Sequence, residues 1–224
     1  MNVLFDLDGT LTDPFEGITR CISHALVALG KSPPPRESLG WCIGPPLRDS
    51  FSKLLDSEEK GLVEKALSFY RERFGTVGLF ENKVYPGIPD ALHDLRKKGH
   101  TLYVATAKPE VYAERIIDHF NLSSHFKKIY GSGLDGTRTS KIELIAHILA
   151  TESLLPHETA MIGDRKFDIT GAKANGVYGL AALWGYGLRE ELEGMAPTDF
   201  LENPRDILAA IHQLSAIVLR KNGE

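Results

Sequence analysis

Short apolar runs alternate with amphipathic segments along most of this chain, and this alternation constrains its fold more than any other feature. The apolar runs have the length of buried strands and fall at residues 3–5, 101–105, 128–130, 159–162 and 177–183. Segments with the apolar spacing of helices lie between them, at residues 89–98, 110–120, 140–149 and 166–174. This order predicts an α/β fold with a doubly wound parallel sheet, whose ligands bind at the carboxyl ends of the strands.

Residues 13–83 break the alternation. Helical patterns succeed one another without a strand at residues 14–29, 37–42, 47–55 and 57–74. Four successive helices of this kind predict a separate helical unit that is inserted after the first strand. We therefore expect an α/β core made of residues 1–12 and 84–224, interrupted by an all-helical domain at 13–83.

The overall charge excludes some partners. The 224 residues include 26 Lys and Arg against 30 Asp and Glu, a formal net charge of −4, so we expect neither nucleic acid nor a membrane surface as a partner. Residues 1–10 lack the basic start and apolar run of a signal peptide, and no stretch has the length of a membrane span. Cys21 and Cys42 form no metal-binding pattern, and we expect both thiols to be reduced and buried. These features predict a soluble cytoplasmic protein.

The first strand ends in two aspartates. Alternate residues of a strand share a face, so Asp6 and Asp8 are expected to project together while Leu7 enters the core. Two carboxylates this close repel each other, and a cation between them relieves the repulsion. An exposed acidic turn is the alternative interpretation, and it predicts no further acids nearby.

Further acids do come after a later strand. Asp164 ends the run at 159–162, and Asp168 lies one helical turn later. Taken alone, Asp164 is explained equally well as a helix N-cap, and Asp168 as a solvated helix residue. Because the carboxyl ends of parallel strands meet at one edge of the sheet, we expect both to converge with Asp6 and Asp8. Oxygen ligands of this kind suit Mg²⁺, which is the predicted cofactor.

Hydroxyl and amine groups complete the candidate site. Thr106 ends the second core strand with a hydroxyl that can donate to a phosphate oxygen, although threonine is common at strand ends. Lys141 lies in the first turn of a helix, where a cation opposes the helix dipole unless an anion lies close by. An exposed lysine is the alternative for Lys141. Lys108 is a second cationic candidate.

These motifs, in this order, resemble those of the haloacid dehalogenase-like superfamily. The resemblance rests on Asp6-Leu7-Asp8-Gly9-Thr10, on Thr106, on Lys141 and on the stretch from Gly163 to Asp168, and it spans nearly the whole chain. The helical insert resembles the cap domain of the phosphoglycolate phosphatase and β-phosphoglucomutase branch. Residues 131–138 are similar to a subgroup described as phosphoglycolate phosphatase-like or 5′-nucleotidase-like.

The resemblance implies a Mg²⁺-dependent phosphatase that acts on a small phosphorylated metabolite. Asp6 would be the nucleophile that forms an aspartyl-phosphate, and Asp8 would be the general acid and then the general base. Thr106 and Lys141 would align the phosphoryl group and neutralise its charge. An Asp at position 8, where ion-pumping relatives have Thr, implies rapid hydrolysis of the intermediate.

The resemblance also implies a metal site and a substrate site. Asp6, Asp8 and Asp164 would ligate the metal, and Asp168 would bind it through water or orient Lys141. The residues expected to bind substrate are Gly9, Thr10, Ala107, Lys108 and, from the helical insert, Arg48. For Arg48, which can pair with a substrate carboxylate or second phosphate, an ion pair with nearby acids is an equal alternative.

Several functions stay open at this point. We expect a phosphoglycolate-like substrate, with a nucleoside 5′-monophosphate as the alternative. The two are hard to separate, because Ala107 stands where many phosphoglycolate phosphatases have Asn. A sugar phosphomutase is less favoured. The resemblance implies that mutases of this branch have a His in the first helix of the insert, and here that helix has no His before His24. A sensor that binds phosphate without turnover is least favoured, because such a protein needs neither Asp8 nor a helical insert. The oligomeric state is left open.

Overall fold

The computed structural model describes residues 1–222 and divides the chain into two compact units. The first unit contains Met1–Thr12 together with the chain from Val84 onward, and the second contains Asp13–Lys83. Strand β2 (Thr12–Asp13) leads from the first unit to the second, and β3 (Lys83–Val84) leads back. These two strands pair with each other, so the chain leaves and re-enters the first unit at one short two-stranded sheet.

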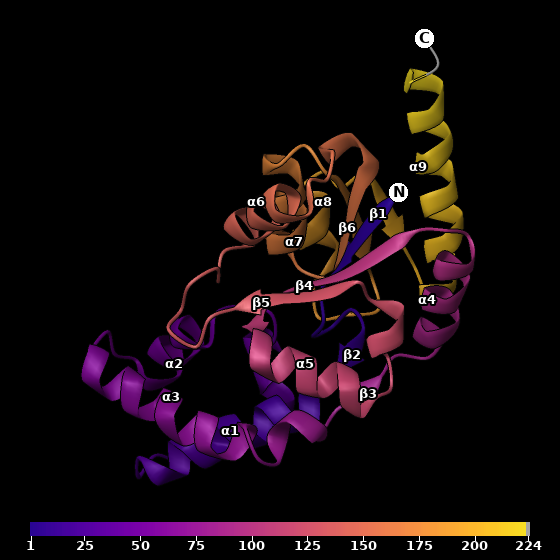
Figure 1. Cartoon of the computed structure of the whole chain (residues 1–224). Helices are drawn as coiled ribbons and strands as arrows, with labels where there is room; N and C mark the ends of the chain where they lie inside the picture. The colour runs from indigo at the N-terminus through magenta and orange to yellow at the C-terminus, as the bar shows by residue number, and fades with distance from the viewer. Residues whose placement is uncertain (223–224) are drawn as a thin grey trace. The chain divides into compact units, whose positions relative to one another are not determined.

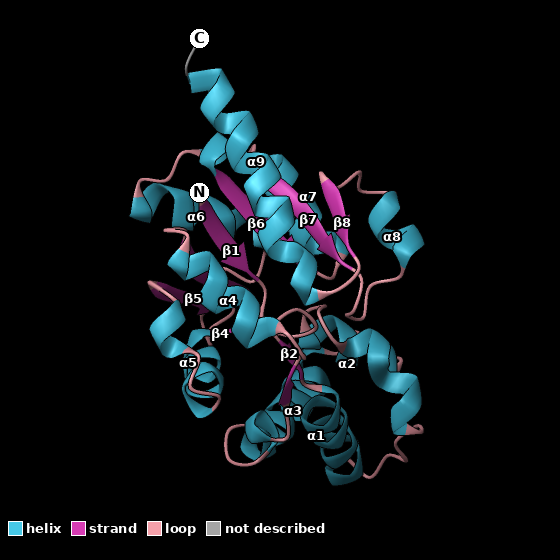
Figure 2. Cartoon of the chain, turned by 90° about the vertical axis from the view of Figure 1, so that its right-hand side faces the viewer, coloured by secondary structure: helices cyan, strands magenta, loops and turns pink. Residues whose placement is uncertain are grey.

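A parallel sheet of six strands forms the centre of the first unit, as Figures 1 and 2 show. Its strands, in chain order, are β1 (Asn2–Phe5), β4 (Thr101–Pro109), β5 (Lys128–Ser132), β6 (Thr159–Gly163), β7 (Tyr178–Ala182) and β8 (Asp199–Leu201). Their order across the sheet is β5-β4-β1-β6-β7-β8, and every pairing is parallel. The predicted α/β class with a doubly wound parallel sheet is therefore confirmed.

Helices cover both faces of this sheet (Figures 1 and 2). The α-helices of this unit, within the described residues, are α4 (Ile88–Lys97), α5 (Glu110–His119), α6 (Lys141–Glu152), α7 (Lys166–Ala174), α8 (Arg189–Glu193) and α9 (Ile207–Asn222). Helix α4 packs against β4 and α9, and α5 packs against β4 and β5. Helices α6 and α7 pack against each other and against the strands of the sheet. Three short 3₁₀ turns, η3 (Ser123–His125), η4 (Pro156–Glu158) and η5 (Pro204–Asp206), lie in the connections.

The central strand β1 is buried on both faces, as its run of apolar residues predicts. Val3, Leu4 and Phe5 have no exposed surface. Phe5 lies opposite Val104 of β4 and Ile162 of β6 in the ladder, so β1 and β6 end at the same edge, while β4 continues past it to Pro109. The residue after Phe5 is thereby held at the carboxyl edge of the sheet.

The second unit is helical. Its elements are α1 (Phe15–Ala28), the 3₁₀ helix η1 (Arg36–Cys42), α2 (Leu47–Leu55), α3 (Lys60–Phe74) and the 3₁₀ turn η2 (Gly78–Phe80). The α1 stripe of apolar residues is buried against α3, and Gly30 ends that helix with φ +72°, as its position predicts. Cys21 and Cys42 are both buried, as predicted, and no disulfide joins them.

The structure differs from the sequence prediction at several boundaries. The helix predicted from residue 57 begins at Lys60, because Asp56 adopts a left-handed conformation and the Ser57 hydroxyl accepts a hydrogen bond from the Glu59 N–H at 3.2 Å. The helix predicted at 37–42 is a 3₁₀ segment confined between Pro35 and the Gly44-Pro45-Pro46 turn. Strand β8 and helices α8 and α9 were not predicted. Within the described residues, no helix is both long and apolar enough to span a bilayer.

We predict that Leu4→Ala lowers the free energy of unfolding by about 2–5 kcal/mol, because it opens a cavity in a fully buried strand. Leu219→Ala is the matched control, since Leu219 is 72% exposed and its truncation is expected to change stability by less than about 0.5 kcal/mol. Urea unfolding followed by circular dichroism measures both. Equal losses in the two variants would contradict the assignment of β1 to the core.

Candidate active site

Asp6 is the first residue after β1 and lies buried at the carboxyl edge of the sheet. Its N–H donates to the Ile162 carbonyl at 2.9 Å, which continues the β1–β6 ladder by one bond. Its Oδ1 accepts the Leu7 N–H at 2.7 Å, and Leu7 is fully buried as predicted. The backbone therefore fixes both the position and the orientation of the Asp6 carboxylate.

A tight turn comes next, at residues 8–12. Gly9 has φ +88°, a conformation that favours glycine. The Gly9 N–H donates to the Thr12 carbonyl at 2.7 Å, and the Thr10 N–H donates to the Leu7 carbonyl at 3.3 Å. The Thr10 hydroxyl donates to Asp164 Oδ1 at 3.3 Å. Gly9 and Thr10, which we expected to bind substrate, thus have their N–H groups engaged within the turn.

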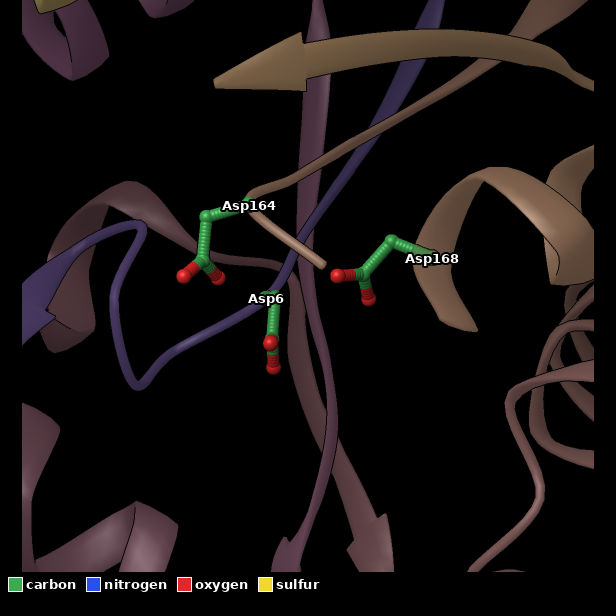
Figure 3. Close-up of side chains that lie close together, drawn as sticks. All are labelled: Asp6, Asp164 and Asp168. Carbon is green, nitrogen blue, oxygen red and sulfur yellow. The ribbon is translucent and has the colours of Figure 1, made fainter. Parts of the chain in front are cut away.

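Three carboxylates converge at this edge. Asp6, Asp164 and Asp168 each place an oxygen within 4.8 Å of the other two, and all three residues are buried. Figure 3 shows their side chains pointing toward one another from the end of β1, the end of β6 and the first turn of α7. The sequence predicted the convergence of these three residues, together with Asp8, from their places near the carboxyl ends of parallel strands.

Lys141 joins two of these carboxylates. It is the first residue of α6, and its Nζ lies 2.9 Å from Asp6 Oδ1 and 2.5 Å from Asp168 Oδ1. The same Nζ donates to the Ala105 carbonyl at 2.8 Å. Burial on its own lowers the Lys141 pKa, but the charges of Asp168 and Asp6 more than offset this and raise it. The ammonium is therefore held charged between the two acids, and the exposed alternative is excluded.

Asp8 has a different partner. Its Oδ2 lies 2.7 Å from the Nζ of Lys108, and both side chains are largely buried. Its carboxylate is not one of the three that converge, although we expected it to ligate the metal. Its other oxygen, Oδ1, is buried and accepts no hydrogen bond from the described residues. Burial raises the Asp8 pKa, and Lys108 only partly opposes this effect.

Residues 106–108 line the end of β4. The Thr106 side chain is buried, and its Oγ1 accepts the Lys108 N–H at 3.3 Å. The Ala107 carbonyl accepts the Ser132 hydroxyl at 2.8 Å, which ties this segment to β5. Thr106 and Lys108 thus lie next to each other at the same strand end, and Lys108 links that end to Asp8.

The charges of the cluster indicate what it can hold. Burial, with the charges of Asp6 and Asp168, raises the pKa of Asp164 well above its ordinary value. Burial raises the pKa of Asp168 to about 6, although Lys141 opposes this shift. Three buried acids face one buried ammonium, so the cluster has an excess of negative charge when ionised. Oxygen-only donors and this charge fit a divalent cation such as Mg²⁺, which Asp6, Asp164 and Asp168 would hold.

Sequence reasoning missed two contributors to this site. The indole N–H of Trp184 donates to the Thr10 carbonyl at 3.0 Å, and the Tyr186 N–H donates to Asp164 Oδ2 at 2.7 Å. Both hydrogen bonds depend on tertiary structure, since one comes from an indole nitrogen and the other from a backbone amide. The glycines at 185 and 187 are the signal that marks a close backbone approach.

Arg48 belongs to the helical unit. It lies on α2, half-exposed, and pairs with Glu64 of α3. An ion pair with nearby acids was one of the two alternatives for this residue, and Glu64 is that partner.

Comparisons with known proteins identify what the chain resembles. Residues 3–182 match the family model described as haloacid dehalogenase-like hydrolase. A 5′-nucleotidase of Pseudomonas aeruginosa is 49% identical over 95% of this chain and 94% of its own length. Phosphoglycolate phosphatase 1 of the same organism is 29% identical over 97% of this chain and 82% of its own.

Two further matches cover most of the chain. The tyrosine-protein kinase PtkA of Mycobacterium tuberculosis is 38% identical over 88% of this chain, which spans 66% of that protein. The crystal structure of a predicted phosphatase from Clostridium acetobutylicum has a TM-score of 0.90 and 36% identity, and the match covers 95% of this chain and 98% of that one.

The raised pKa values give the metal-free protein a defined pH dependence. A carboxyl group whose pKa is higher in the folded state contributes stability that is full below its unfolded pKa and lost as the pH rises through its folded pKa. For Asp168 this window lies between 3.8 and about 6, and Asp8 and Asp164 shift in the same direction. Lys141 contributes no change in stability in this pH range, because its pKa is raised above 10.5.

We predict that Mg²⁺ raises the unfolding temperature more at pH 8 than at pH 5, because at pH 5 it must displace protons from these acids. At a Mg²⁺ concentration of about 100 times its Kd, Mg²⁺ is expected to raise the free energy of unfolding at pH 8 by about 2.7 kcal/mol. Thermal unfolding with Mg²⁺ or EDTA measures the effect, and Asp164→Asn is expected to reduce it. Equal gains at both pH values, or an undiminished gain in Asp164→Asn, would contradict a carboxylate metal site.

Proposed function

Because the chain belongs to the haloacid dehalogenase-like hydrolase family and is a phosphoric monoester hydrolase, we propose that it is a Mg²⁺-dependent phosphatase that forms an aspartyl-phosphate on Asp6. One observation carries the proposal: Lys141 joins Asp6 to Asp168 in a buried cluster whose third acid is Asp164. This arrangement pairs Asp6 with a buried ammonium, and the Leu7 N–H orients its carboxylate, as the role of a nucleophile requires. It also leaves charge for a divalent cation to neutralise.

In this proposal Asp6 and Asp8 divide the chemistry. An Asp6 oxygen attacks phosphorus, the bond to the leaving oxygen breaks, and Asp8 donates a proton to that oxygen. Asp8 then removes a proton from the water that attacks the aspartyl-phosphate, which releases phosphate and restores Asp6. The raised pKa of Asp8 supports its role as the acid of the first step.

The remaining residues align the phosphoryl group. Bound Mg²⁺ would neutralise charge on the phosphoryl oxygens. The Thr106 hydroxyl and the N–H groups of residues near Ala107 are proposed as donors to these oxygens, and Lys141 as the fixed cation. Lys108 is proposed to hold Asp8 before substrate binds and to contact the phosphoryl group afterwards. Gly9 and Thr10 shape the turn beside Asp6.

The relatives order the candidate substrates. A nucleoside 5′-monophosphate is the proposed substrate class, because the relative named 5′-nucleotidase is 49% identical to this chain and the phosphoglycolate phosphatase is 29% identical. This reverses the order favoured by the sequence alone, in which a phosphoglycolate-like substrate came first. A sugar phosphomutase remains the lesser alternative, and the phosphatase relatives disfavour a sensor without turnover.

The helical unit, Asp13–Lys83, is proposed to be a cap that selects substrate. Arg48 would contact substrate only by exchanging its Glu64 partner for a substrate group. A cytoplasmic location is part of the proposal and agrees with two buried cysteines that no disulfide joins.

We predict that Asp6→Asn reduces phosphate release by at least about 10³-fold while the unfolding transition stays intact, because the amide is not a nucleophile. Asp94→Asn, on the exposed face of α4, is the matched control and keeps wild-type turnover. A colorimetric phosphate assay with Mg²⁺ measures both, and EDTA is expected to abolish the wild-type signal. Turnover by purified Asp6→Asn at the wild-type rate would refute the nucleophile assignment.

We predict that kcat/KM for nucleoside 5′-monophosphates exceeds that for 2-phosphoglycolate by about tenfold or more, a difference of about 1.4 kcal/mol in transition-state binding. The same phosphate assay, run over nucleotides, 2-phosphoglycolate and hexose phosphates, gives the ranking. Preference for 2-phosphoglycolate would contradict the nucleotide proposal and favour a phosphoglycolate-like substrate. Interconversion of hexose phosphates without phosphate release would indicate a mutase. Incubation with ATP, and then detection of phosphotyrosine, is the counter-screen for the kinase named among the relatives.

A further inference from the structure

Residues 183–188, which lie between β7 and α8, pack around Asp164. The Tyr186 N–H donates to Asp164 Oδ2 at 2.7 Å. The Thr10 hydroxyl donates to the other oxygen, Oδ1, at 3.3 Å. Each oxygen of this carboxylate therefore has one donor from the protein, and the two donors come from segments that lie far apart in the sequence.

Trp184 connects these two segments. Its indole N–H donates to the Thr10 carbonyl at 3.0 Å, across 174 positions in the chain. The same Thr10 residue holds Asp164 through its hydroxyl. Trp184 is thus connected to Asp164 through one residue, Thr10.

Glycines make this close approach possible. A methyl group on Gly185 would lie 2.3 Å from the Cβ of Asp164 and 2.4 Å from the Gly9 carbonyl oxygen. A methyl group on Gly187 would lie 1.9 Å from the Asp164 carbonyl oxygen. A methyl group on Gly9 would lie 2.2 Å from Asp164 Oδ2. Any side chain at these three positions would have to displace Asp164.

We propose that Trp184, Gly185 and the Tyr186 amide are a positioning element that sets the affinity of the Asp6, Asp164 and Asp168 cluster for a divalent cation. The inference rests on the proposed function, since it concerns the same cluster. A carboxylate oxygen that accepts one hydrogen bond keeps a lone pair for a cation, so the two donors fix the carboxylate without occupying it. Fixing it in advance lowers the cost of binding, and loss of such supporting contacts typically weakens metal binding by about 10–100-fold.

The first test is Mg²⁺ binding to the purified protein without substrate, by isothermal titration calorimetry. Trp184→Phe keeps an aromatic ring and removes the N–H donor, and we expect it to raise the Kd for Mg²⁺ by about tenfold or more. Trp41→Phe is the matched control, because Trp41 is 41% exposed and lies on η1 of the helical unit. It is expected to bind Mg²⁺ as the wild type does.

A second variant tests the same element without changing a donor. Gly185→Ala is expected to weaken Mg²⁺ binding by pushing Asp164 aside, whereas Gly194→Ala meets only ordinary contacts at 3.6 Å and is the control. At saturating Mg²⁺, KM for the phosphorylated substrate is expected to stay at its wild-type value in both Trp184→Phe and Gly185→Ala. Weaker Mg²⁺ binding with an unchanged KM separates positioning of the metal ligand from a general loss of structure. Circular dichroism and thermal unfolding check the structure independently.

The outcomes separate the inference from the function on which it rests. Wild-type Mg²⁺ affinity in correctly folded Trp184→Phe and Gly185→Ala would overturn the positioning role and leave the proposed phosphatase intact. Absence of Mg²⁺ binding by the wild-type protein would overturn the proposed metal site itself. Weakened binding in both variants with unchanged controls would support the inference.

Discussion

Mutual repulsion among buried carboxylates is the constraint on which the rest of this site depends. Asp6, Asp164 and Asp168 lie within 4.8 Å of one another, away from solvent, where ionised acids are costly unless opposite charge compensates them. Lys141 supplies one positive charge and bridges two of the three. The remaining excess of negative charge defines a place for a divalent cation, and a phosphoryl group brought there would meet both cations.

The topology supplies this concentration of charge. Strand β1 lies at the centre of the sheet with β4 and β6 on either side, so the residues after β1 and β6 and the last residues of β4 lie at one edge. Helices α6 and α7 then add Lys141 and Asp168 from their first turns. The segment after β7 packs against Asp164. It contributes the Tyr186 amide as a donor, and its glycines allow the close approach. The fold therefore fixes these side chains before any ligand arrives, which suits the proposed phosphoryl transfer, because that reaction depends chiefly on positioning and charge stabilisation.

Much of this could be predicted from the sequence, because strand periodicity and topology determine it. The convergence of Asp6 with Asp164 and Asp168 results from their places after parallel strands. The separation of Asp8 from that group could not be predicted, because the strand ends at Phe5 and its alternation no longer governs the residues of the turn. The role of Trp184 was also hidden, since its contact with Thr10 depends on tertiary structure and not on local pattern.

The most direct test of the aspartyl-phosphate mechanism is to trap the covalent intermediate. The protein would be mixed with Mg²⁺ and a nucleoside 5′-monophosphate, quenched during turnover, and treated with borohydride, which reduces an acyl phosphate to an alcohol. Peptide mass spectrometry is expected to find homoserine in place of Asp6, and only when substrate is present. Steady turnover with Asp6 unmodified, or reduction at Asp8 instead, would contradict the mechanism.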